Sequence, residues 1–179
     1  MTSKEFSDYA ELPENAHRFL ELIDGEVIEK MPSFTPSELA TMLIFYLRLY
    51  LRDHPIGRLS APDDMYVMDD ENSFIPNVGF ISNERFGARP DRAVLVPPDL
   101  AVEIKSPTDR LRAVRRKAER YLELGTRVVW LVVPETQTIE VYTADSDVIT
   151  LAADNLLDGG TVLPGFSVKV SDIFAVLKD

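Results

Sequence analysis

The sequence predicts a single domain of the α/β (α+β) class. Two stretches with strand character, 99–105 and 127–133, flank an amphipathic helical pattern, and an Asp-Gly pair near the start predicts a β-hairpin. The chain has 179 residues and 45% hydrophobic content, which is enough for one substantial core. We therefore expect one domain, because the chain is too short for two to be the default.

The hairpin is predicted over residues 19–31. Apolar side chains stand on both sides of Asp24 and Gly25, a dipeptide that favours a two-residue hairpin turn. Residues 1–18 form a polar N-terminal extension, which we expect to be loose apart from one helical turn at its end. The domain itself is therefore predicted to span 19–179.

Two amphipathic helices are predicted, because apolar residues recur in them at intervals of three and four. The first covers 36–52 and ends before Pro55 and Gly57. The second runs to about Leu124 and stops at Gly125. The candidate N-caps are Thr35 or Ser37 for the first helix and Thr108 or Asp109 for the second.

The strands are expected to form one sheet around two central segments. Residues 76–82 would pair antiparallel with 99–105, and the loop 83–98 between them is long enough to act as a mobile flap. The run 127–133 is almost wholly apolar, as in a central strand covered on both faces. Shorter strands are predicted over 57–61, 64–68, 138–143, 147–151 and 161–163, with an acidic turn at 69–72 and a short helix over 170–177.

Composition restricts the classes of function. The chain has no Cys and two His, so the expected metals are hard cations bound by oxygen, and disulfides are excluded. No apolar run reaches the length of a membrane span and the start lacks a signal-peptide core, so we expect a cytoplasmic protein without membrane contact. The formal charge of −11 disfavours nucleic acid unless a local basic patch exists.

The segment 99–105 carries three charges among apolar residues. Period-two geometry places Asp99, Glu103 and Lys105 on one face of the strand, with Asn77 opposite the last two. Asp99 lies about 13 Å from Glu103 along the strand, too far to share a metal, so we expect it to support the site by capping backbone groups. Because a buried, unpaired charge costs many kcal/mol, Glu103 and Lys105 form either an ion pair or part of a functional site.

Several motifs resemble a known family. The pair Pro76-Asn77 and the triplet Glu103-Ile104-Lys105 resemble the bipartite PD-(D/E)XK signature of restriction-endonuclease-like nucleases. Over residues 19–177, the chain resembles the Uma-two type family, widespread bacterial proteins of this nuclease fold with no well-established activity. The segments that carry this resemblance are ELIDGEVIEKMP, IPNVGFIS, PPDLAVEIKSPTDR, RRKAERYLELGTRVVWLVVP, TIEVY and LPGFSV.

The resemblance implies a restriction-endonuclease-like mixed central sheet flanked by helices, with an N-terminal β-hairpin and extra C-terminal strands. It also implies metal-dependent hydrolysis of DNA phosphodiester bonds. Mg²⁺ or Mn²⁺ would be held by Glu103, by the residue at position 77 and by the main-chain carbonyl of Ile104, while Lys105 would orient or activate the attacking water. Mg²⁺ suits such a role, because it binds one or two carboxylates together with waters and phosphate oxygens.

Asn77 departs from the family pattern, which usually has Asp at this position. A neutral amide should weaken metal binding, so the site is either attenuated or completed by a neighbour. Glu26 and Glu38 are the candidate supporting carboxylates. The alternative to a nuclease is a catalytically inactive nuclease-fold module for binding or assembly.

The second helix has a basic face that is a candidate for contacts with nucleic-acid phosphates. Glu119 and Glu123 dilute this face, so it is either a DNA contact or an ordinary solvated surface. Exposed strand edges and apolar C-terminal segments favour a homodimer, in which two sites could address two strands. The basic residues of the face are Arg112, Arg115, Arg116 and Arg120.

Overall fold

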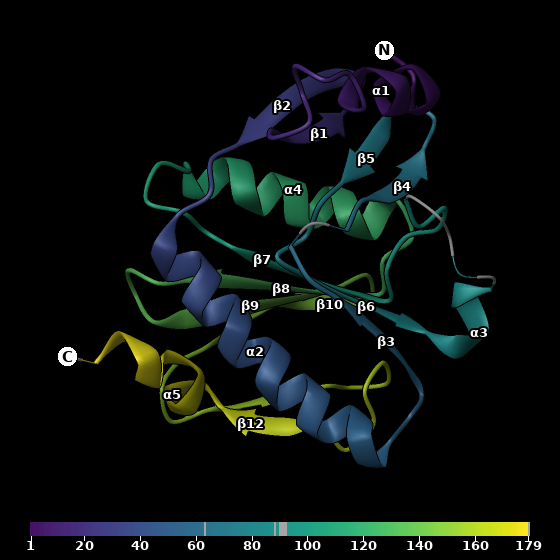
Figure 1. Ribbon diagram of the computed structural model, residues 1–179. Helices are drawn as coiled ribbons and strands as arrows, with labels where there is room; N and C mark the ends of the chain where they lie inside the picture. Colours follow the sequence, from purple (N-terminus) through teal and green to yellow (C-terminus); the bar gives the residue numbers. More distant parts are fainter. Residues whose placement is uncertain (63, 88, 90–92, 179) are drawn as a thin grey trace.

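The fold has the expected mixed central sheet, flanking helices, N-terminal hairpin and extra C-terminal strands (Figure 1). A computed structural model describes residues 1–62, 64–87, 89 and 93–178. The helices are α1 (Ser3–Ala10), α2 (Phe34–Asp53), α3 (Asn83–Phe86), α4 (Leu111–Glu123) and α5 (Val170–Ile173), followed by a 3-10 turn (Phe174–Leu177). The strands are β1 (Phe19–Ile23), β2 (Glu26–Lys30), β3 (Gly57–Ser60), β4 (Tyr66–Asp69), β5 (Asn72–Phe74), β6 (Val78–Ser82), β7 (Leu100–Ile104), β8 (Val128–Val133), β9 (Thr138–Thr143), β10 (Ser146–Leu151), β11 (Leu156–Asp158) and β12 (Ser167–Lys169).

The central sheet has six strands in the order β10-β9-β8-β7-β6-β3. Strands β7 and β8 are parallel, and α4 makes the crossover that a parallel pair requires. The predicted antiparallel pairing of 76–82 with 99–105 is confirmed, with Val78 opposite Val102. Strand β7 therefore lies inside the sheet, with a neighbour on each side.

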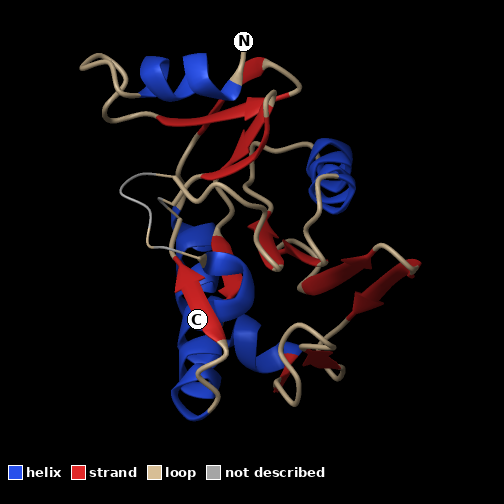
Figure 2. Ribbon diagram, turned by 90° about the vertical axis from the view of Figure 1, so that its right-hand side faces the viewer, coloured by secondary structure: helices blue, strands red, loops and turns tan. Residues whose placement is uncertain are grey.

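The two faces of the central sheet are covered by different elements (Figures 1 and 2). Helix α2 and the C-terminal segments pack on the face that carries Leu100, Val102 and Ile104 of β7. Helix α4 and residues of β4 and β5 pack on the opposite face, which carries Ala101. The alternation along β7 predicted these two faces, and all five of its residues are buried.

A second, four-stranded antiparallel sheet has the order β2-β1-β5-β4. The predicted hairpin forms half of it, with Leu22 of β1 opposite both Val27 of β2 and Ser73 of β5. Strand β5 was not predicted, because its start lies in the segment assigned to an acidic turn. The expectation of a loose start is wrong: a capping box of Thr2 and Glu5 begins α1, and buried Phe6 packs against the hairpin.

Other local expectations need correction. Helix α2 begins after Ser33, without a side-chain cap, rather than after Thr35 or Ser37. The N-cap of α4 is Arg110 rather than Thr108 or Asp109. The segment 161–163 is a turn rather than a strand, because it lies in the connection between β11 and β12, which pair with each other.

The long loop after β6 begins with α3 and includes a bridge between Val94 and Tyr66. The part of the expected flap at residues 88 and 90–92 lies outside the described residues. Within the described residues, none of the helices is both long enough and apolar enough to cross a lipid bilayer.

Candidate functional site

Glu103 is the buried carboxylate around which the site is built. It stands on β7 between two paired strands, and only 3% of its surface is exposed. Its side chain leaves the face of the sheet that α4 covers, because Glu103 shares that face with Ala101. A carboxylate in this position must find partners from the elements packed above the sheet.

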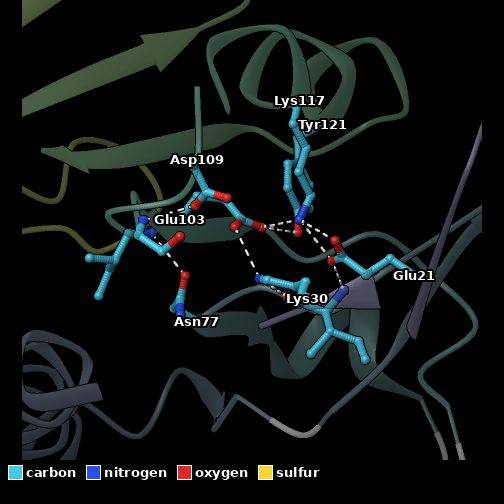
Figure 3. A network of polar contacts seen from close by, with 10 residues as sticks. Glu21, Lys30, Asn77, Glu103, Asp109, Lys117 and Tyr121 are labelled. Atoms are coloured by element: carbon cyan, nitrogen blue, oxygen red, sulfur yellow. Dashed lines mark hydrogen bonds and ion pairs between the residues drawn. The ribbon is translucent and has the colours of Figure 1, made fainter. Parts of the chain in front are cut away.

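Three side chains provide these partners (Figure 3). The Tyr121 hydroxyl of α4 donates a hydrogen bond of 2.8 Å to Oε1 of Glu103, and Lys117 Nζ lies 2.8 Å from the same oxygen. Lys30 Nζ of β2 lies 3.3 Å from Oε2. Burial alone would raise the pKa of Glu103, but the two ammonium groups outweigh it and hold the pKa below its ordinary value. Glu103 is therefore ionised at neutral pH.

Glu21 of β1 is a second buried carboxylate in the same place. Its oxygens lie 2.7 and 2.8 Å from Lys117 Nζ, and Oε1 accepts a 2.6 Å hydrogen bond from the main-chain N–H of Ile75. Lys117 thus bridges Glu21 and Glu103. We call Glu21, Lys30, Glu103, Lys117 and Tyr121 the ion cluster.

The ion cluster is electrically balanced, since it combines two carboxylates with two ammonium groups. Burial would lower the pKa of Lys30, but Glu103 and Glu21 outweigh it and raise the pKa above its usual value. Burial and the Glu103 charge likewise raise the pKa of Tyr121, which keeps its hydroxyl protonated as a donor. Every charged group in the cluster has an opposite charge within hydrogen-bonding distance.

Sequence reasoning missed Glu21 and the roles of Lys30 and Lys117. A signal for Glu21 existed, because it stands between Leu20 and Leu22 in a strand pattern, as Glu103 stands among apolar residues of β7. Lys117 also follows the spacing of the apolar stripe, one helical turn before Tyr121. Which of these side chains meet could not be read from either pattern.

Asn77 is tied to the backbone of β7. Its N–H donates to the carbonyl of Val102 at 2.9 Å, and its Oδ1 accepts from the N–H of Ile104 at 2.8 Å. The amide oxygen that was predicted as a metal ligand therefore already has a hydrogen-bond donor. Asn77 and Ile104 do lie beside Glu103, as the pairing of β6 with β7 predicted.

Lys105 points away from the ion cluster. It follows the last residue of β7, and its Nζ pairs with Glu135 and donates to the carbonyl of Ser106 at 2.9 Å. Among the described residues, no contact joins Lys105 to Glu103. The alternative in which Glu103 and Lys105 form an ion pair is therefore wrong.

A pocket of about 510 Å³ opens beside the ion cluster. Asn77, Glu103 and Ile104 line it, and so do Lys30 and Lys117. Asp109 also lines it, from the turn before α4, and its Oδ2 accepts a 2.8 Å hydrogen bond from the N–H of Ser106. The described lining does not include Lys105, Glu26, Glu38 or Asp99.

The residues as arranged do not fit a bound Mg²⁺ or Mn²⁺ ion. Both Glu103 oxygens face ammonium groups, and the Asn77 oxygen faces an N–H. Within the described chain, no group of three or more His, Asp or Glu side chains is placed to hold a metal ion. A dication would also be repelled by ammonium groups about 3 Å from its candidate ligand.

The supporting acidic residues lie elsewhere. Glu26 is exposed at the start of β2, opposite Ile23, and Glu38 is half-buried just after the first turn of α2. Asp99 is fully buried at the entrance to β7, where it accepts from the N–H of Ser82 at 2.7 Å and from Arg85 at 3.0 Å. That geometry is the backbone cap expected of Asp99.

The basic face of α4 is divided between ion pairs and free charges. Arg115 pairs with Glu140, and Arg120 pairs with Asp24 and Glu123. The other two arginines are exposed and form no ion pair with the described residues; they are Arg112 and Arg116. Only half of the predicted basic face therefore remains available to a ligand.

The Uma2 family, described as putative restriction endonucleases, matches residues 6–171 of the chain. No curated protein matches it. Among solved structures, it is similar to a putative nuclease belonging to DUF820 from Anabaena variabilis ATCC 29413, with a TM-score of 0.85, 22% sequence identity and 99% of each chain covered. That likeness concerns the fold. Because the family match spans nearly the whole chain and confirms the resemblance drawn from the motifs, this protein belongs to the Uma2 family.

Proposed function

We propose that this protein binds DNA through its nuclease fold, with phosphodiester hydrolysis silenced at Glu103. The observation that carries the proposal is the ion cluster, in which Lys30 and Lys117 neutralise the carboxylate that the family signature assigns to a metal. Asn77 adds no negative charge beside it. The protein would then act as a binding or assembly module of the Uma2 family.

The proposed DNA contacts lie on α4 and at the rim of the pocket. Arg112 and Arg116 are one helical turn apart and exposed, and Arg110 lines the pocket mouth just before the helix. Arginine binds phosphate oxygens well, because its planar guanidinium offers paired donors. This local positive charge would have to act against the overall charge of −11, so the binding should depend strongly on salt.

A second candidate function is metal-dependent cleavage of DNA phosphodiester bonds. Family membership favours it, since a divalent cation is then a candidate cofactor. In this candidate, Glu103, Asn77 and the carbonyl of Ile104 would be the ligands of Mg²⁺ or Mn²⁺, and Lys105 would assist the attacking water. It requires a rearrangement, because Glu103 is paired with lysines and Lys105 with Glu135.

One experiment separates the two candidates. Fluorescence anisotropy would measure the binding of labelled duplex and single-stranded DNA in EDTA, and nicking of supercoiled plasmid would be followed in Mg²⁺ and in Mn²⁺. We expect binding in EDTA at low salt that weakens in Arg112→Ala/Arg116→Ala, and no nicking. Arg52→Ala is the matched control, because Arg52 is an exposed helical arginine on α2.

Two outcomes would reject the proposal. Absence of DNA binding at low salt would show that DNA is not the ligand. Nicking that disappears in Glu103→Gln would establish the metal-dependent nuclease instead. Equal weakening by Arg52→Ala and by the double variant would mean that α4 is not the contact surface. Because binding and nicking are read separately, each part of the proposal can fail alone.

A homodimer is part of the proposal. Strand β10 is one edge of the central sheet, and Val148 and Ile149 on it are 48% and 54% exposed. An exposed strand edge with apolar side chains favours pairing with a second copy. Light scattering should give about twice the chain mass of 20.2 kDa, and Ile149→Lys should halve it. A wild-type protein of single-chain mass would refute the dimer.

A further inference from the structure

We infer that Lys30 and Lys117 are built-in counter-ions that hold Glu103 and Glu21 in place of a divalent cation, and that Lys30 is the group that keeps a cation out. The ion cluster then links the two sheets without a metal ion. This inference does not depend on DNA binding.

The ion cluster joins elements that are far apart in sequence (Figure 3). Glu21 and Lys30 come from the hairpin β1-β2, Glu103 from the central sheet, and Lys117 from α4. Lys117 reaches both carboxylates, and Lys30 also donates to the carbonyl of Ile75 at 2.9 Å. The four charges therefore tie the N-terminal sheet to the central sheet and to α4, with no charge left over.

The two lysines are not equivalent. Lys117 has both Glu21 oxygens within 2.8 Å, and its side chain is only 11% exposed. Both lysines line the pocket, but Lys30 lies at the longer distance of 3.3 Å from Glu103 and its side chain is 29% exposed. A cation that enters from the pocket would meet Lys30 at the Glu103 oxygen that it approaches. Lys30 is thus the group that excludes it.

Two substitutions should convert the ion cluster into a site that binds a divalent cation. Lys30→Met removes the ammonium and keeps a long flexible side chain, so that the charge of the cluster falls from zero to −1. Asn77→Asp adds a carboxylate whose oxygen can still accept the Ile104 N–H at the same place. Together they add a carboxylate beside Glu103 and remove its Lys30 partner, and Asp109 lines the same pocket. Carboxylates are ligands that Mg²⁺ and Mn²⁺ accept.

The test measures thermal unfolding in EDTA, Mg²⁺ and Mn²⁺, with calorimetric titration of the same ions. We expect no metal-dependent shift of Tm for the wild type. For Lys30→Met/Asn77→Asp we expect a rise of about 3–6 °C at ten times the measured Kd, abolished when Glu103→Gln is added. Circular dichroism establishes that each variant is folded before it is titrated.

The matched control is Lys105→Met/Asn77→Asp, which removes a lysine from the same end of the sheet that pairs with Glu135 instead. This variant should show no shift. A wild-type shift that Glu103→Gln removes would overturn the inference. So would an equal shift in the control, or a folded Lys30→Met/Asn77→Asp variant that binds neither ion.

Discussion

The hydroxyl of Tyr121 provides a direct measure of how much the ion cluster stabilises the fold. Tyr121 is fully buried, and its ring packs edge-on against Phe74 with centroids 4.8 Å apart. Tyr121→Phe keeps this packing and removes only the donor to Glu103. Hydrogen bonds to charged groups contribute about 1.5–3 kcal/mol, so we expect the free energy of unfolding to fall by that amount.

Tyr66→Phe is the matched comparison. Tyr66 is buried to the same degree, but its hydroxyl lies 2.8 Å from the neutral hydroxyl of Ser60. Loss of a neutral hydrogen bond should lower the free energy of unfolding by only about 0.5–1.5 kcal/mol. For a chain of this size, each kcal/mol corresponds to about 2–4 °C in Tm.

Guanidinium unfolding followed by fluorescence measures both variants, because the single tryptophan, Trp130, is buried in the core. The slope of the free energy against denaturant should stay unchanged, since neither variant alters the surface exposed on unfolding. A Tyr121→Phe loss no larger than the Tyr66→Phe loss would refute the view that Glu103 depends on a charged hydrogen bond inside the cluster.

Three further predictions concern the frame around the site. Burial would raise the pKa of Asp99, but the Ser82 N–H and Arg85 outweigh it and lower the pKa. The contribution of ionised Asp99 to the stability of the fold is therefore complete above the ordinary Asp pKa, and it is lost as the pH falls through the lowered pKa. Asp99→Asn should flatten stability against pH in that acid range, and an unchanged profile would contradict this. Phe6→Ala should lower the free energy of unfolding by about 3–5 kcal/mol in denaturant titrations, because Phe6 is fully buried; a loss below about 1 kcal/mol would mean that α1 is dispensable. Gly79→Ala should cost about 1–3 kcal/mol by the same assay, because its methyl group would collide with the Tyr66 hydroxyl, and a neutral effect would contradict this close approach.

Local patterns predicted the frame of the site correctly. The alternation along β7 placed Glu103 on one face and its apolar neighbours on the other, and the strand pairing brought Asn77 beside it. Such features depend on backbone period and on neighbours along the chain. They can therefore be read from a short stretch of sequence.

The partners of Glu103 could not be predicted in the same way. Period-two geometry favoured Lys105, but β7 ends at Ile104, so the side chain of Lys105 is free to turn toward Glu135. The actual partners, Lys30 and Lys117, arrive when the hairpin and α4 dock on the sheet. Ion pairs over such separations are fixed by tertiary packing, which no local pattern contains.

The helix α1 was missed for a related reason. Its composition is polar, and its burial depends on one aromatic residue, Phe6, which fills a space between α1 and the hairpin. The capping box of Thr2 and Glu5 was a readable signal for the start of a helix. A capping box alone does not stabilise so short a polar helix, which also needs the surface of the hairpin on which Phe6 packs.

The way the ion cluster is assembled has a consequence for the protein while the ribosome is still making it. Lys117 follows Glu21 by 96 positions. At 5–20 residues per second, the Glu21 carboxylate waits about 5–20 s for that ammonium group. Strand β1 also lacks β5 until the chain has passed Ser73. The hairpin therefore emerges early, with α1 already made to cover Leu20 and Leu22 through Phe6, but its buried carboxylate is among the last groups to be paired.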